Sequence, residues 1–136
     1  MATNLTGSCM CGAVQYEITK KSRLTVNCHC TICRKGNGSA FSTYASVLES
    51  GFSIVKGADS IQKYALGEKG EKNFCGTCGS PLFNKNNKYP GFYMVHYGSL
   101  NTPNNIEPST NVFFDNKLPW VCSIEQLNNF EHEVKK

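Results

Sequence analysis

The sequence is poor in charge, because Asp, Glu, Lys and Arg make up only 18% of its 136 residues, against about a quarter in an average globular domain. It has one tryptophan, and no apolar run approaches the roughly 20 residues of a membrane-spanning helix. Residues 1–8 have neither the charged start nor the apolar run of a secretory signal. We therefore expect a cytoplasmic protein with no membrane partner, in a compartment that keeps thiols reduced.

A large excess of basic charge is also missing. The formal net charge is +4, and it falls to +1 if seven cysteines bind two Zn²⁺ ions as thiolates. Basic residues do not alternate with aromatic ones, and the one basic cluster, at residues 20–23, is typical of a solvated turn. Nucleic acid is therefore not a predicted partner.

The sequence does contain 40% hydrophobic residues, enough for the core of one domain spanning residues 1–136. Val14, Tyr16 and Ile18 alternate with polar neighbours, which is the period of a half-buried strand. Clusters of Gly, Asn and Pro separate further short segments of this kind, so we predict a mostly β fold of short antiparallel strands. Besides 14–18, the predicted strands are 24–28, 40–48, 52–56, 61–66, 81–84, 91–97 and 111–115.

Little helix is expected. Residues 31–35 can form one turn. Near the C-terminus, Ser123 and Gln126 have the spacing of a capping box, which predicts a short helix after Ser123.

Eight cysteines are the most informative residues. The absence of a secretory signal argues against disulfides, and their tight grouping favours metal, because several thiolates from short segments can converge on one ion. Cys122 stands alone after Trp120 and Val121, which predicts a buried apolar thiol. The other seven form three groups: Cys9 and Cys11; Cys28, Cys30 and Cys33; Cys75 and Cys78.

Spacing divides these seven cysteines between two sites. Cys28, Cys30 and Cys33 lie within six residues, so they can surround one metal ion. The two remaining pairs, Cys9 with Cys11 and Cys75 with Cys78, together complete a closed four-thiolate structural zinc site. Gly79, directly after Cys78, predicts a tight turn whose backbone N–H groups point at sulfur.

The second site would have three protein ligands and an open fourth position, the pattern of a catalytic zinc. Cys122, His29 or His96 could close it, but we expect the His29 side chain to point away from its two neighbouring ligands and His96 to be a packed or solvated strand residue. Zn²⁺ with three thiolates carries charge −1 and is a weak Lewis acid, so a soft thiol is the natural fourth ligand. Arg34 and Lys35 follow Cys33 directly and could pair with an anionic ligand.

With these residues in place, the sequence resembles the glutathione-dependent formaldehyde-activating enzyme family. The resemblance is carried by residues 7–16, 28–35 and 74–83, which hold the three cysteine groups, and by residues 115–120, which end at Trp120. The sequence departs from the family's pattern at Asn111, where many relatives have a histidine.

The resemblance implies a β-tent fold organised around two zinc ions per chain. It implies structural zinc on Cys9, Cys11, Cys75 and Cys78, and a second zinc on Cys28, Cys30 and Cys33. The implied activity is a carbon–sulfur lyase that condenses glutathione with formaldehyde, with Arg34, Lys35 and Trp120 as candidate substrate-binding residues.

Two other interpretations remain open. The chain could be a related lyase that acts on another small thiol or another small aldehyde. It could also be a non-catalytic, zinc-stabilised protein-binding module, because a fold does not determine a function. The sequence predicts no oligomeric state.

Overall fold

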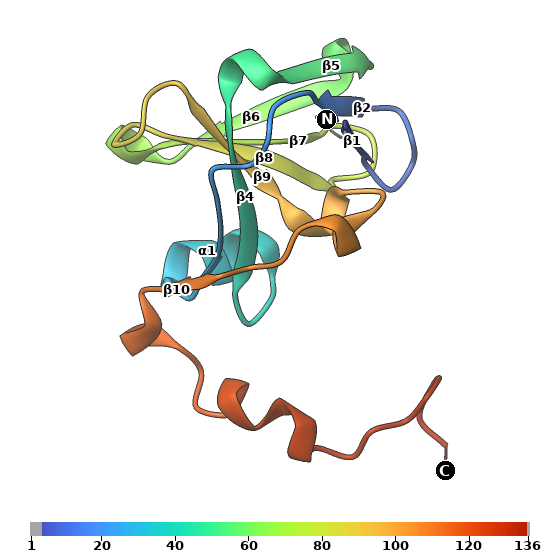
Figure 1. Cartoon of the computed structure of the whole chain (residues 1–136), viewed down its shortest axis with the longest axis vertical. Helices are drawn as coiled ribbons and strands as arrows, with labels where there is room; N and C mark the ends of the chain where they lie inside the picture. The colour runs from blue at the N-terminus through green and yellow to red at the C-terminus, as the bar shows by residue number, and fades with distance from the viewer. Residues whose placement is uncertain (1–3, 136) are drawn as a thin grey trace.

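A computed structural model describes residues 4–135, whose regular structure is mainly two β-sheets (Figure 1). One sheet has three antiparallel strands in the order β1-β2-β5, and the other has seven in the order β10-β3-β4-β9-β8-β7-β6. The mostly β prediction is therefore confirmed. The strands are β1 Leu5–Ser8, β2 Gln15–Ile18, β3 Leu24–Cys28, β4 Ser42–Leu48, β5 Phe52–Lys56, β6 Ile61–Ala65, β7 Gly70–Cys75, β8 Pro81–Asn86, β9 Phe92–His96 and β10 Thr110–Val112.

Helix is scarce, as predicted. Within the described residues, α1 (Thr31–Asn37) is the one α-helix, two residues longer than the predicted turn. Gly38 ends it in the left-handed conformation, at φ 65°. The other helical segments are 3₁₀ turns: η1 Glu49–Gly51, η2 Ala58–Ser60, η3 Gly67–Lys69, η4 Tyr97–Ser99, η5 Pro103–Asn105, η6 Phe114–Asn116 and η7 Val121–Gln126.

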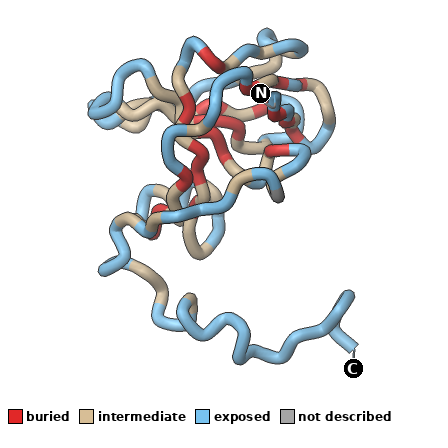
Figure 2. Tube along the Cα trace, in the orientation of Figure 1, coloured by how far each residue is buried: buried red, intermediate tan, exposed pale blue. Residues whose placement is uncertain are grey.

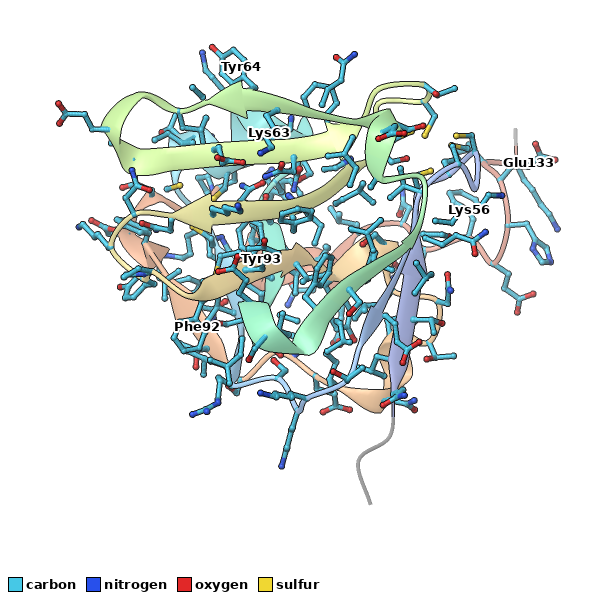
Figure 3. The ribbon with its side chains drawn as sticks, turned by 90° about the horizontal axis from the view of Figure 1, so that it is seen from above. Lys56, Lys63, Tyr64, Phe92, Tyr93 and Glu133 are labelled. Carbon is cyan, nitrogen blue, oxygen red and sulfur yellow. The ribbon has the colours of Figure 1, made fainter. Side chains whose placement is uncertain are left out.

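Two strands, β1 and β7, escaped the sequence prediction. β7 has little apolar alternation, since it carries the charged residues Glu71 and Lys72, and Glu71 pairs with a side chain of the neighbouring β6. The Lys63 ammonium on β6 lies 3.8 Å from the Glu71 carboxylate on β7, and the Lys85 ammonium on β8 lies 5.1 Å from the centre of the Tyr93 ring on β9. Figure 3 shows Lys63 and Tyr93 on these strands from above.

The predicted strand 111–115 was wrong in its second half. β10 ends at Val112, because Phe113 adopts a left-handed backbone conformation at φ 51° and Phe114 begins a 3₁₀ turn. β10 also breaks the antiparallel rule: it runs parallel to β3, with Val112 paired to Cys28.

The core lies where the two sheets meet. The predicted alternation holds: Val14, Tyr16 and Ile18 are at most 1% exposed. They belong to one apolar cluster with residues of the seven-stranded sheet, including Val47, Leu82 and Val95. Gly7 pairs with Tyr16 across β1 and β2, and a Cβ at Gly7 would lie 2.1 Å from the Tyr16 ring. The small residue therefore lets the tyrosine lie flat across β1.

The segment after β10 leaves the body of the molecule and is largely exposed (Figures 1 and 2). The predicted C-terminal helix is wrong, because η7 consists of 3₁₀ turns joined at a non-helical Ser123. The predicted burial of Cys122 is also wrong: its thiol is exposed, because the turn packs against no sheet. We call residues 117–135 the tail, and its exposed apolar side chains are Trp120, Ile124, Leu127, Phe130 and Val134.

Across residues 4–135, no helix combines the length and the apolar character needed to cross a membrane.

Candidate metal centres

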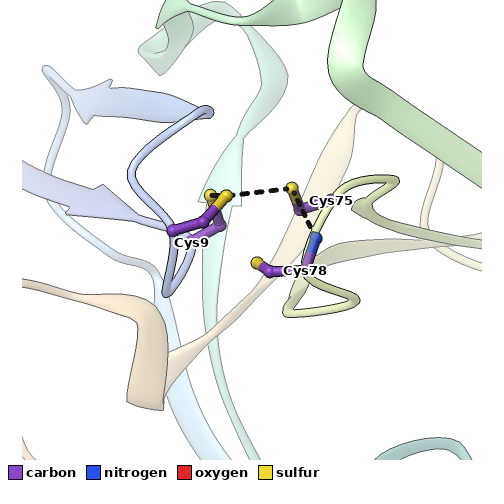
Figure 4. A group of neighbouring side chains, drawn as sticks. Cys9, Cys75 and Cys78 are labelled. Carbon is purple, nitrogen blue, oxygen red and sulfur yellow. Dashed lines mark hydrogen bonds between the residues drawn. The ribbon is translucent and has the colours of Figure 1, made fainter.

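Four cysteines from both sheets converge at one point. Cys9 and Cys11 lie in the connection between β1 and β2, whereas Cys75 ends β7 and Cys78 lies in the turn before β8. Their four Sγ atoms all lie within 4.8 Å of one another, and Figure 4 shows the group. The cluster therefore ties the three-stranded sheet to the seven-stranded sheet.

Backbone amides surround the sulfurs of this four-cysteine cluster. The N–H groups of Thr77 and Cys78 point at Cys75 Sγ, at 3.4 and 3.5 Å, and Val14 N–H donates to Cys9 Sγ at 3.2 Å. Gly79 closes the turn at φ 80°, with its N–H bonded to the Cys75 carbonyl at 2.8 Å. The predicted tight turn is confirmed, and its amides stabilise negative charge on sulfur.

Ser80 adds a side-chain donor. Its Oγ accepts a hydrogen bond from Met10 N–H at 2.9 Å, which leaves the hydroxyl proton free to point at Cys78 Sγ, 3.2 Å away. This hydrogen bond lowers the pKa of Cys78 to about 5. Cys78 is therefore more acidic than an ordinary thiol, which favours the thiolate form that a metal binds.

The distances fit a metal site rather than disulfides. Tetrahedral zinc with Zn–S bonds of about 2.3 Å separates its sulfurs by about 3.8 Å. Cys9 and Cys11 have their Sγ atoms 3.6 Å apart, and Cys11 and Cys75 have theirs 3.8 Å apart. All eight cysteines are free thiols. The donor set and its spacing therefore fit a closed four-thiolate ion.

A second cluster lies where β3 joins α1. Cys28 ends β3, Cys30 is the N-cap of α1, and Cys33 lies in the first turn. Their Sγ atoms lie within 4.8 Å of one another, and the Cys28 and Cys30 sulfurs are 3.5 Å apart. Cys33 N–H donates to Cys30 Sγ at 3.3 Å, so the helix start fixes one sulfur toward the other two.

The three thiols share protons unequally. The hydrogen bond from Cys33 lowers the pKa of Cys28 to about 6, whereas the same bond raises the pKa of Cys33 above its usual range. Without a metal, Cys28 is thus the more acidic thiol of the pair and Cys33 the less acidic one. A bound cation would displace the thiol proton, which is the ordinary behaviour of thiol ligands.

Within the described chain, the three-cysteine cluster gathers three sulfurs and no fourth ligand of a similar kind. Among the residues that the structure describes, no His, Asp, Glu or further Cys completes the group. Four buried side-chain atoms in the described chain have no hydrogen-bond partner, and three of them lie between residues 29 and 37: His29 Nδ1, Arg34 Nε and Asn37 Oδ1.

Neither of the two histidines that could have closed this site belongs to the cluster. His29 is buried between the rings of Phe41 and Phe114, and its Nε2 lies 3.2 Å from Asn111 Oδ1. We expected this side chain to point away from the neighbouring cysteines, and its contacts are with Asn111 and the two phenylalanine rings. His96 is buried, and its Nε2 lies 3.1 Å from Asn84 Oδ1.

The candidate substrate-binding residues lie in two places. Arg34 and Lys35 are on α1 directly after Cys33, with one Arg34 Nη 3.3 Å from the Thr31 hydroxyl. Trp120 is 44% exposed in the tail. It lies six residues after Phe114 in the chain. The Phe114 ring packs edge-on against His29.

Two contacts, one at the cluster and one at the Phe114 ring, were not predicted from the sequence. The Tyr44 hydroxyl on β4 donates to Cys33 Sγ at 3.4 Å, although the two residues are 11 apart and only strand pairing brings them together. The Lys117 ammonium lies 4.6 Å from the centre of the Phe114 ring. Lys117 belongs to a segment that the sequence singled out, but nothing local indicated its partner.

Comparison with known proteins gives consistent matches. The profile of a family described as "Glutathione-dependent formaldehyde-activating enzyme" matches residues 4–116. A protein of Halomonas elongata named "Putative glutathione-dependent formaldehyde-activating enzyme" is 27% identical over 124 residues, which is 86% of this chain and 79% of that protein. A crystal structure of a Rhodobacter sphaeroides protein is similar with a TM-score of 0.64 and 25% identity, over 79% of this chain and 99% of that one.

Proposed function

We propose that this chain, which belongs to the glutathione-dependent formaldehyde-activating enzyme family, is a zinc-dependent carbon–sulfur lyase. It would join glutathione, or another small thiol, to formaldehyde and form an S-hydroxymethyl hemithioacetal. The observation that carries the proposal is the convergence of Cys28, Cys30 and Cys33 without a fourth partner of these residue types in the described chain.

Two zinc ions per chain would have separate tasks. The four-cysteine cluster would hold a structural zinc, because it offers four thiolates. The three-cysteine cluster would hold the second zinc with three thiolates, which leaves a place for the substrate thiol. When bound there, zinc supplies a Lewis acid that lowers the pKa of the substrate thiol.

The reaction itself needs no redox partner. The substrate sulfur attacks the carbonyl carbon of formaldehyde, a C–S bond forms, and the C=O π bond breaks as its electron pair moves to oxygen. The proton lost by the thiol ends on that oxygen, so atoms and charge balance. The protein contributes by holding the thiol and aldehyde close together, which converts a bimolecular encounter into a local one.

Arg34 and Lys35 are the proposed partners of the glutathione carboxylates. Glutathione has two carboxylates and one ammonium group, and both cations directly follow Cys33 in α1. A separate cavity of about 680 Å³ borders Cys9, Asn37 and His96, but no Asp, Glu, Lys or Arg is found among its described lining residues. Arg34 and Lys35 on α1 are therefore a more favourable binding site for the charged peptide than this cavity. Trp120 is a candidate to pack over the bound peptide.

Two alternative functions use the same fold in different ways. A lyase for another aldehyde would use the same cysteines with a differently shaped pocket. A non-catalytic binding module is favoured by one observation: the tail, which lies beyond the matched residues 4–116, exposes several large apolar side chains.

The deciding experiment is exchange NMR of glutathione with formaldehyde, recorded with zinc-loaded protein, with free zinc, and with the Cys30→Ser variant. The proposal predicts that, of the three samples, only the zinc-loaded wild-type protein accelerates exchange above the uncatalysed rate. The Cys30→Ser variant should not, because the substitution removes one ligand of the open site. Turnover only with other aldehydes would support the related lyase. No acceleration with any aldehyde by fully zinc-loaded protein would contradict both lyases.

A further inference from the structure

A chain of hydrogen bonds crosses three strands and ends on a sulfur of the three-cysteine cluster. It starts at Asn37 on α1, whose Nδ2 lies 3.4 Å from His96 Nδ1 on β9. His96 Nε2 lies 3.1 Å from Asn84 Oδ1 on β8. Asn84 Nδ2 donates to the Tyr44 hydroxyl at 3.2 Å, and that hydroxyl donates to Cys33 Sγ at 3.4 Å.

The orientation of the Asn37 and Asn84 amides fixes the direction of each link in this chain. An amide oxygen cannot donate, so His96 must place its proton on Nε2 to reach Asn84 Oδ1. His96 Nδ1 is then a bare acceptor for the Asn37 amide. Because Asn84 donates to the Tyr44 oxygen, the single hydroxyl proton of Tyr44 is left for sulfur. All four donors therefore point the same way, toward Cys33.

Burial keeps this direction fixed. Tyr44 and His96 are 6% and 5% exposed, and their rings pack edge to face with centres 4.8 Å apart. Burial, together with the nearby Lys72 charge, lowers the pKa of His96 to about 4. The imidazole is therefore neutral at physiological pH and keeps one donor and one acceptor, as the chain requires.

We propose that Tyr44 is a positioning residue for the open metal site, and that the Asn37–His96–Asn84 chain fixes its hydroxyl proton on the sulfur of Cys33. Aligned hydrogen bonds polarise one another, so the last one withdraws more charge from the thiolate than an isolated hydroxyl would. A metal centre with three thiolates has an excess of negative charge, and this bond reduces it at one ligand. The consequence is stronger metal retention and a sulfur that donates less charge to the metal.

The proposal rests on the metal site proposed above but not on turnover, so it can be tested by spectroscopy alone. Co²⁺ is loaded in place of zinc, and the spectrum of the Cys30→Ser variant, which keeps only the four-cysteine cluster, is subtracted. For Tyr44→Phe we expect the sulfur-to-cobalt charge-transfer band to move to lower energy. We also expect Co²⁺ to bind the open site about tenfold more weakly, the effect of losing a hydrogen bond to a charged group.

Asn84→Asp provides a second variant with unchanged shape. Its carboxylate would accept the Tyr44 proton instead of donating to the oxygen, so the same band shift is expected although the tyrosine is still present. Tyr93→Phe is the matched control, because it removes a hydroxyl on the same sheet that bonds to Glu49 at 3.2 Å rather than to a cysteine. Its spectrum should match wild type.

Three outcomes would overturn the proposal. These are an unchanged band in folded Tyr44→Phe protein, an equal shift in Tyr93→Phe, or an unshifted Asn84→Asp spectrum. Failure of the lyase activity is a separate result: a wild-type protein that does not turn over, but whose variants show the expected shifts, supports this inference and contradicts the proposed reaction.

Discussion

The two cysteine clusters differ in how much chain each one closes. Cys11 and Cys75 are 64 residues apart, whereas Cys28 and Cys33 are five apart. In the chain-entropy treatment of cross-links, closing a loop of about 65 residues stabilises the fold by about 4 kcal/mol, and closing about 6 residues by about 2 kcal/mol. Metal in the four-cysteine cluster should therefore contribute about twice as much to stability.

Two serine substitutions test this difference. Cys75 is fully buried, and Cys75→Ser should remove one zinc and at least about 4 kcal/mol, a large part of the 5–15 kcal/mol that holds a typical domain. Cys30→Ser should also remove one zinc but cost only about 2 kcal/mol, because the two sheets stay tied. Native mass spectrometry counts the zinc, and urea unfolding followed by circular dichroism gives the free energy.

The reasoning fails if Cys30→Ser unfolds the chain as readily as Cys75→Ser, or if either protein keeps two zinc ions. Cys122→Ser is the matched control, since this thiol is exposed and outside both clusters. It should keep two zinc ions and wild-type stability within about 0.5 kcal/mol.

Three further predictions concern packing, pH and substrate. Leu82 is fully buried, so Leu82→Ala should lower the free energy of unfolding by about 2–5 kcal/mol in urea titrations; a loss below about 1 kcal/mol would mean that the core is not packed as described. His96 has a pKa lowered from 6.5 to about 4 by burial and by Lys72, so the unfolded chain binds the extra proton first as pH falls. Wild type should therefore lose about 3 kcal/mol between pH 6.5 and 4 relative to His96→Gln, whereas parallel pH profiles would contradict the assignment. Lys35→Ala should raise KM for glutathione up to about fivefold with little change in kcat, more at low salt; an effect on kcat alone would place Lys35 outside substrate binding.

The division of the seven cysteines between two sites could be predicted from the sequence, because metal ligands in short segments are a local signal. Cys28, Cys30 and Cys33 are neighbours in the chain, and the remaining two pairs could only be matched with each other. The structure brings both sets of sulfurs together. The strand at residues 14–18 could also be predicted, because the two-residue period of its apolar side chains reflects one buried face.

What the sequence could not provide depends on long-range pairing. Tyr44 reaches Cys33 only because β3 and β4 pair with Val26 opposite Tyr44, and His96 joins them only because β9 pairs on the other side of β4. β7 was missed because its charged residues look like a turn until their cross-strand partners are known. Cys122 was placed in the core because its apolar neighbours suggested burial, but the tail packs against no sheet.

The parallel pairing of β10 with β3 has a consequence for synthesis of the chain. All ligands of the four-cysteine cluster have left the ribosome once residue 78 has emerged, so the end of β7 can be tied to the β1–β2 connection early. His29, by contrast, gains its bonds to Asn111 and to the Val112 carbonyl only when β10 arrives. The nascent protein thus has all four ligands of this cluster before the β10 partners of His29, which follow more than thirty residues later.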